Sequence, residues 1–523
     1  MRRSRSLRAF AAALSLAAAL PASARVGFGD PSEAWREREP GQTVALEGHL
    51  RLRAASFLDL DLDRPAGPAT SLWPAGEGAL DHTAGADLRA RLRPSFFLGG
   101  FGRLVLELDL VDLALGARPT GTPFGDRTGL VAATAFQEPA VGIELRSAYG
   151  EVILPVGILA AGRMPSHFGL GIAANAGDDL DDDGGDRSDR VAFVLPLFGH
   201  FLAAGYDLGA SGPQVSAAGV APAAGLPSTR VQSVSLAAVR FHAPWETDLY
   251  RQKGRPLLNY GLALSHTWQA RDLPAYYQTL EAPTSIPPEL TVERGARTFV
   301  ADLWVRATFG ALRLELEAVA THFRIDNASP WPGVTLRQPV QGNPFGAVLQ
   351  VAWEPPEGRF DLVAEVGLAS ADPAPGFPLA SPTAFGGGRP GDVSGSQLDG
   401  SRDTRMDAFR FHPAYAVDLV LWRTLLGGVS EAAYGRTRLR FRPGSAVELE
   451  ANLVYSHGLS AASNPGGVAP LGLELDLGAE LTFDHFAARL SWGGLAALGG
   501  LGTRGEPAPP FAQVFLLRFS YAL

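Results

Sequence analysis

Cysteine is absent from the 523 residues, lysine occurs once, and no apolar run is long enough for a membrane-spanning helix. The lack of cysteine excludes disulfide frameworks, thiol nucleophiles and cysteine-ligated metal centres. Of the 45 basic residues only Lys253 is a lysine, and the formal net charge of −9 disfavours a nucleic-acid binder, which is normally basic. A helix across a bilayer needs about 18 apolar residues in a row, so we expect no transmembrane helix.

Charged residues are also scarce, at 19%, whereas apolar residues reach 46%. This composition is too apolar for a disordered, collagenous or coiled-coil chain. The chain is long enough for several domains or for one very large one. The arrangement of the apolar residues along the chain therefore indicates what covers so much apolar surface.

The N-terminus has the features of an export signal. Four arginines lie within the first eight residues, an apolar run follows over residues 9–20, and residues 22–24 form the small-x-small pattern that signal peptidase accepts. We therefore predict a signal peptide over residues 1–24, a periplasmic segment over residues 25–43 and one remaining domain over residues 44–523.

That domain alternates apolar and charged residues with the two-residue period of a β-strand. Leu50 and Leu52, for example, alternate with Arg51 and Arg53. The same alternation returns in residues 88–98, 104–110, 312–317 and 471–481. A soluble sandwich does not explain charged faces on so many strands, whereas a transmembrane barrel turns apolar residues to lipid and tolerates charge toward a wet lumen.

The charged faces predict the residues that line this lumen. The first three predicted strands carry a basic wall, which consists of Arg51, Arg53, Arg89, Arg91, Arg93 and Arg103. Later strands carry an acidic arc, which consists of Glu315, Glu317, Asp361, Glu365, Glu448, Glu450, Glu474, Asp476 and Glu480. Opposite charges across a narrow passage would favour hydrophilic solutes. The alternative is that these charges pair locally with neighbours across the strands.

The connections predict the strand count, because outer-membrane barrels have short periplasmic turns and long outer loops. Nine long stretches rich in glycine, proline and aspartate alternate with short breaks, which gives 18 strands. Residues 242–256 are long for a periplasmic turn, and residues 415–426 must be a loop element, or the count fails by one. We therefore predict an all-β fold, a transmembrane antiparallel β-barrel of about 18 strands with long outer loops, and 16 strands is the alternative.

The last residues alternate large apolar side chains up to the final position: Phe511, Phe515, Leu517, Phe519, Tyr521 and Leu523. This pattern resembles the terminal strand of bacterial outer-membrane barrels, in which the usual last residue is phenylalanine rather than leucine. The resemblance implies the barrel-assembly machinery and outer-membrane lipid as partners. It also implies the outer membrane of a Gram-negative bacterium as the location.

An internal stretch carries a second resemblance. The residues GRMPSHFGLGI (Gly162–Ile172), Asn175 and GDDLDDDGGDRSDRV (Gly177–Val191) look like those of an uncharacterised porin-like family of outer-membrane barrels from myxobacteria and their relatives. That resemblance implies a porin-like architecture over most of the chain and no established activity.

The same stretch contains a candidate calcium loop. Asp179, Asp181, Asp183 and Gly184 reproduce the opening of a loop in which alternating carboxylates converge on a hard cation. The twelfth position is an arginine and no helices flank the loop, which excludes an EF-hand. Asp186 or Asp189 could complete the ligands. The alternative is a solvated acidic outer loop without a metal.

No catalytic set of residues is visible. Ser166 and His167 are adjacent, so on an extended segment their side chains point to opposite sides. We therefore expect no enzyme and no cofactor other than the candidate calcium. The predicted function is a porin-like channel for passive or weakly selective passage of small hydrophilic solutes. The alternatives are an outer-membrane enzyme of the lipid hydrolase type and a secreted carbohydrate-binding β-protein; the oligomeric state stays open.

Overall fold

The computed structural model describes residues 43–64, 82–115, 143–208, 231–272, 291–329, 333–335, 338–356, 358–374, 391, 404–504 and 511–523. The predicted signal peptide and residues 25–42 of the predicted periplasmic segment lie outside these residues. Among the described residues, no helix is long and apolar enough to cross a membrane.

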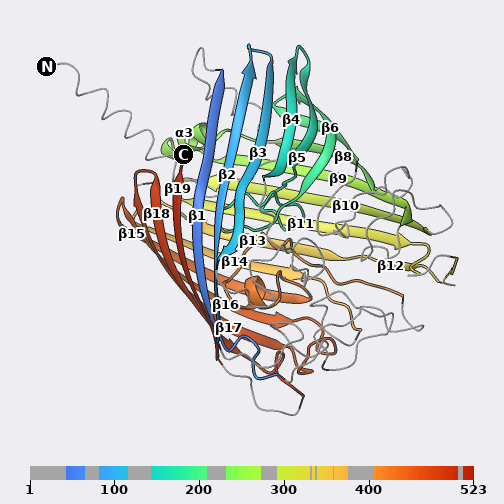
Figure 1. Ribbon diagram of the computed structural model, residues 1–523, viewed down its shortest axis with the longest axis vertical. Helices are drawn as coiled ribbons and strands as arrows, with labels where there is room; N and C mark the ends of the chain where they lie inside the picture. Colours follow the sequence, from blue (N-terminus) through green and yellow to red (C-terminus); the bar gives the residue numbers. More distant parts are fainter. Residues whose placement is uncertain are drawn as a thin grey trace.

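One antiparallel sheet closes on itself to form a barrel (Figure 1). Its strands are β1 (Val44–Leu58), β2 (His82–Leu98), β3 (Gly102–Leu115), β4 (Glu144–Leu154), β5 (Gly157–Pro165), β6 (Arg187–Leu197), β7 (His200–Leu208), β8 (Gln232–Arg240), β9 (Leu257–Asp272), β10 (Val292–Phe309), β11 (Leu312–Ile325), β12 (Val340–Gly342), β13 (Phe345–Trp353), β14 (Phe360–Ala369), β15 (Ala432–Gly444), β16 (Val447–Gly458), β17 (Pro470–Phe483), β18 (Phe486–Ala497) and β19 (Phe511–Ala522).

The barrel has 18 strand positions, because the short β12 and the longer β13 pair one after the other with the same strand, β11. The predicted count of 18 is therefore confirmed and the alternative of 16 is wrong. β19 closes the barrel by pairing with β1 from His49 opposite Ala522 to Leu58 opposite Gln513.

The side chains alternate across the barrel wall as the two-residue period predicts. On β1, Leu50 is 46% exposed and Leu52 is 36% exposed on the outside, whereas Arg51 and Arg53 are buried on the inside. A closed barrel pairs its own strand edges, so it can face hydrocarbon without unpaired backbone groups. Apolar exterior and charged interior together match a barrel that spans a bilayer.

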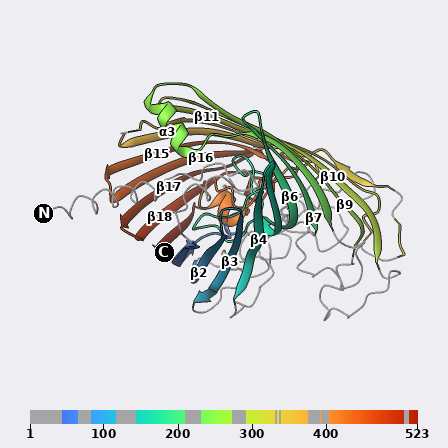
Figure 2. The ribbon, with the colours of Figure 1, turned by 90° about the horizontal axis from the view of Figure 1, so that it is seen from above.

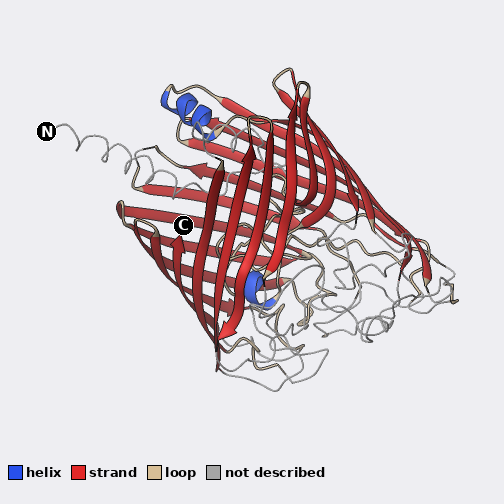
Figure 3. Ribbon diagram, turned by 45° about the horizontal axis from the view of Figure 1, so that its top comes forward, coloured by secondary structure: helices blue, strands red, loops and turns tan. Residues whose placement is uncertain are grey.

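Two connections contain helices. The long turn between β8 and β9 holds α3 (Pro244–Gln252), which Arg251 ties to the next turn through a 3.1 Å hydrogen bond from its Nε to the carbonyl oxygen of Gly310. The connection between β14 and β15 holds η4 (Leu421–Leu425), a single π-helical turn. Both lie in connections between strands, as the count of 18 requires (Figure 3).

Two connections fold into the barrel. They are residues 166–186, termed the β5–β6 loop, and residues 404–431, termed the β14–β15 loop. Seen from above, η4 lies inside the ring of strands (Figure 2). Leu421 and Trp422 of this turn are buried in one apolar cluster with Leu495 and Val514 of the wall. The lumen is therefore partly filled at the level of these loops.

Candidate functional site

The basic wall meets the acidic stretch of the β5–β6 loop inside the barrel. Asp183 accepts hydrogen bonds from Arg53 at 2.8 and 2.9 Å and from Arg51 and Arg89 at 3.3 Å. Burial alone raises the pKa of the Asp183 carboxyl, but the charges of Arg53, Arg51 and Arg89 outweigh burial and hold this pKa well below its usual value. The Asp183 carboxylate thus binds the β5–β6 loop to three arginines of the wall.

The other arginines of the basic wall have partners on neighbouring strands. Arg91 forms an ion pair with Asp109 at 2.6 Å, and Arg103 forms one with Glu151 at 2.9 Å. Arg93 lies beside Tyr149 of β4. These contacts match the alternative of local pairing across strands rather than a free positive surface.

Most of the acidic arc is paired in the same way. Its ion pairs are Glu315 with Arg306 and Arg313, Asp361 and Glu448 with Arg442, Glu365 with Arg436, Glu450 with Arg440 and Arg489, and Glu480 with Arg518. The lumen is therefore lined by matched pairs, and a role of these residues in permeation stays a prediction.

Glu317 and Glu474 bind backbone instead of arginine. Glu317 accepts hydrogen bonds from three successive N–H groups of the β5–β6 loop, residues 170–172. Glu474 does the same for residues 419–421 of the β14–β15 loop, at 3.0, 2.6 and 2.9 Å. The alternation of apolar and charged residues within β11 and β17 predicts that both glutamates face inward. No sequence signal shows that their partners are amide groups far along the chain.

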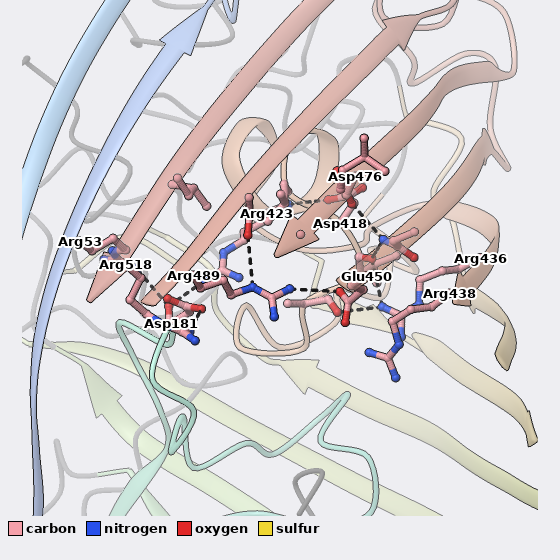
Figure 4. Close-up of a pocket in the computed structure, with 18 residues that line it drawn as sticks. Arg53, Asp181, Asp418, Arg423, Arg436, Arg438, Glu450, Asp476, Arg489 and Arg518 are labelled. Atoms are coloured by element: carbon pink, nitrogen blue, oxygen red, sulfur yellow. Dashed lines mark hydrogen bonds and ion pairs between the residues drawn. The ribbon is translucent and has the colours of Figure 1, made fainter. Parts of the chain in front are cut away.

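A cavity of about 190 Å³ lies between these loops and strands β15 to β19 (Figure 4). Its charged lining consists of Arg53, Arg423, Arg436, Arg438, Arg489, Arg518, Asp181, Asp418, Glu450 and Asp476. We term this cavity the chamber. Side chains from both loops and from the wall line the chamber, and arginines outnumber carboxylates among its charged lining residues.

Arg438 differs from its neighbours in the chamber. Among the described residues, it forms no hydrogen bond and no ion pair, although Arg436 beside it binds Glu365 and two carbonyl oxygens of the β14–β15 loop. A guanidinium group without a partner in a polar cavity is a natural anchor for an anion. Sequence reasoning missed Arg438, because nothing in its own segment distinguishes it from the paired arginines.

Four of the five carboxylates of the candidate calcium loop lie beside different partners. Asp181 pairs with Arg518, Asp183 with the wall arginines and Asp189 with Arg163. Asp179 donates its N–H to Asp182, and Asp186 lies 3.6 Å from His412. In the part of the chain that the structure describes, no three acidic or histidine side chains are grouped to hold a metal ion. Calcium binding stays a prediction, and the expected solvated outer loop is instead folded against arginines.

The arginine partners and the calcium hypothesis make opposite predictions for removal of divalent metal: the arginine partners alone would leave the β5–β6 loop in place. We expect a chelator to leave protease cleavage between Gly177 and Arg190 unchanged, because arginines already neutralise the carboxylates. The measurement is limited proteolysis of the detergent-extracted protein with calcium or with chelator. Faster cleavage after chelation would show instead that calcium holds the loop.

No family model and no curated protein matches the chain. Among solved structures, OpdL of Pseudomonas aeruginosa is similar over 91% of this chain and 99% of its own, with 12% identity and a TM-score of 0.47. The outer membrane protein opdK of the same organism is similar over 92% and 99%, with 11% identity and a TM-score of 0.47. An anion-selective porin from Comamonas acidovorans covers 92% and 99%, with 12% identity and a TM-score of 0.38.

At such low identities and TM-scores these similarities carry no conclusion about function. The barrel is established by its own strand pairing, which closes from β19 to β1. The resemblance to a myxobacterial family stays a prediction.

Proposed function

We propose that the protein is an outer-membrane channel for small hydrophilic solutes, with the chamber as its narrow part. The observation that supports this most is the distribution of side chains, which is the opposite of that in a soluble protein: charged side chains line the interior and exposed leucines cover the exterior. Barrels of 16 to 18 strands are wide enough to leave an aqueous passage. Among the described residues, the two inward loops fill part of the interior.

The chamber supports a preference for anions. Six of its charged lining residues are arginines and four are carboxylates, and Arg438 has no partner among the described residues. An unpaired positive charge in a narrow passage attracts anions and repels cations. The channel should therefore be weakly anion-selective.

Planar-bilayer recording of the refolded protein tests this proposal. We expect stepwise conductance and a reversal potential in a salt gradient that reports anion preference. Arg438→Glu should shift the reversal potential toward cations, whereas Lys253→Glu, the same charge change at an exposed residue beyond α3, should not. Absence of conductance from folded barrels would contradict the channel, and equal shifts in both variants would contradict the role of Arg438.

One contact favours a second candidate, the lipid hydrolase. Ser56 Oγ and His82 Nε2 are 2.9 Å apart on the outer side of β1 and β2, where lipid would lie. His82 has no carboxylate partner among the described residues, and a serine nucleophile needs a base that a third group orients. Release of fatty acid from detergent-dispersed phospholipid that disappears in Ser56→Ala would favour this candidate.

A further inference from the structure

The two inward loops are attached to the wall by the same chemistry. In each case one glutamate carboxylate accepts three successive backbone N–H groups, and in each case the glutamate is essentially inaccessible to solvent. Glu317 stands on β11 and Glu474 on β17, two strands that are not neighbours. Three amides that point at one carboxylate form an anion-binding concavity, so each glutamate is a specific anchor rather than a surface charge.

Loss of either glutamate carboxylate would leave three buried N–H groups without an acceptor, which would destabilise the docked loop. Backbone N–H groups buried without an acceptor are costly, so a loop that loses its carboxylate gains by moving toward water. The β14–β15 loop carries Asp418 and Arg423 into the chamber next to this anchor. Arg423 in turn donates a 2.7 Å hydrogen bond to the carbonyl oxygen of Asp181 on the β5–β6 loop. The position of one loop therefore supports the position of the other.

We infer that Glu474, together with Glu317, sets the width of the passage by holding the two loops inside the barrel. The inference rests on the proposed channel function and deepens it, because these residues determine the size limit for solutes. Neither glutamate has to touch a solute. Both act through the loops, as positioning residues.

The other contacts of the β14–β15 loop explain why a single change should shift this segment without unfolding it. Val417 accepts hydrogen bonds from Arg436 at 3.0 Å and from Asn452 at 3.1 Å. The indole N–H of Trp422 donates to Ser456 at 2.9 Å. These contacts keep both ends of the segment on the wall, so loss of Glu474 frees mainly the stretch that borders the chamber.

The carboxylates around this anchor support the inference. Asp418 of the loop lies beside Glu474 and Asp476 of the wall, and burial first, then the charge of Asp476, raises the pKa of Asp418 to about 8. The charged groups that face it are Arg53, Asp181, Arg423, Arg436, Arg438, Glu450, Glu474, Asp476, Arg489 and Arg518. Because the pKa of Asp418 is raised in the docked loop, docking favours the protonated carboxyl. Docking is therefore strongest at low pH and weakens as the pH rises toward about 8.

The first test compares Glu474→Gln with Glu246→Gln in planar bilayers. Glu246 also accepts a backbone N–H, that of Ala243 at 3.1 Å, but at the start of α3 and away from the chamber. We expect Glu474→Gln to raise single-channel conductance several-fold and to admit larger sugars in liposome swelling, whereas Glu246→Gln matches the unchanged chain. Glu317→Gln should widen the passage in the same direction.

A disulfide tether between the β14–β15 loop and the wall allows the docked and the released loop to be compared in one protein sample, so that differences in folding between variants do not affect the result. A Cβ atom built on Gly493 lies 2.9 Å from Cβ of Leu419 and 2.8 Å from Oδ1 of Asp476, so Leu419 and Asp476 must both move outward before the pair has the spacing of about 3.8 Å that a disulfide needs. The chain has no cysteine of its own. In Glu474→Gln combined with Leu419→Cys and Gly493→Cys, oxidation should return conductance to the level of the unchanged chain, and reduction should raise it again in the same sample.

The outcomes separate the inference from the proposed function. If the unchanged chain does not conduct, the channel itself is wrong. If it conducts and neither Glu474→Gln nor reduction of the tether alters conductance, the anchor role of Glu474 is overturned. Conductance that rises with pH between about pH 4 and about pH 8, but not in Asp418→Asn, supports the docked loop as the narrow part.

Discussion

Deletion of residues 519–523 should abolish barrel assembly. These residues hold nearly half of the seam between β19 and β1, including Tyr521 opposite Leu50 and Phe519 opposite Leu52. The N–H of Leu523 also donates a 2.9 Å hydrogen bond to the carbonyl oxygen of Gly48. Without this half, β1 exposes unpaired backbone groups, which a bilayer does not tolerate. Heat-dependent mobility of envelope protein on gels measures the folded fraction, which we expect to fall to background.

Leu523→Phe is the matched control for that deletion. It keeps the seam and restores the side chain that usually ends such barrels, so assembly should match that of the unchanged chain. Folded barrels at normal levels after the deletion would show that the last residues of β19 are not needed for closure in the membrane.

Asp183→Asn should detach the β5–β6 loop. The change removes one of the two carboxylates that Arg51 and Arg53 share, since Asp87 also pairs with both, and it removes an ion-pair partner of Arg89. Removal of one partner from buried ion pairs costs about 3–5 kcal/mol, which is large against the single hydrogen bonds to the carbonyl oxygens of Leu180, Asp181 and Asp182 that would still join the loop to these arginines. We expect protease cleavage between Gly177 and Arg190 to accelerate strongly while the heat-dependent gel shift of the barrel persists.

Asp189→Asn, in the same acidic stretch, supplies the control. Asp189 pairs with Arg163, and both side chains are about half exposed, so this pair contributes about 1 kcal/mol or less. Cleavage should then remain slow. The pKa of Asp183 lies below its usual value, so its contribution is complete at neutral pH and is lost only as the pH falls through that lowered value. Equal cleavage of both variants would contradict the arginine cluster.

The β-barrel itself could be predicted from residues in sequence order. Antiparallel strands pair with their neighbours along the chain, so the alternation of Leu50 and Leu52 with Arg51 and Arg53, and the spacing of long and short connections, already contain the count of 18. Local pairing of charges could be foreseen for the same reason, since Arg91 and Asp109 stand on adjacent strands. Neither inference needs contacts between distant parts of the chain.

The candidate site depends on such distant contacts. Asp179, Asp181 and Asp183 suggested calcium because their spacing is a local pattern, whereas the arginines that bind Asp183 stand about a hundred residues or more away. A polar loop has the same composition whether it lies in water or inside a barrel.

The alternating faces and the strand count could be predicted from the chain alone, because they follow from a two-residue period and from pairing between strands that are neighbours in the chain. The closing strand could be predicted from the alternation of its own residues, 511–523, although its partner β1 lies at the other end of the barrel domain. The three-dimensional fold was needed to show that two connections fold inward, that Glu317 and Glu474 bind their amides, and that Arg438 has no partner among the described residues. Docking of the loops depends on which charges and amides meet across the lumen. Barrel closure brings these groups together from segments that are remote in the chain.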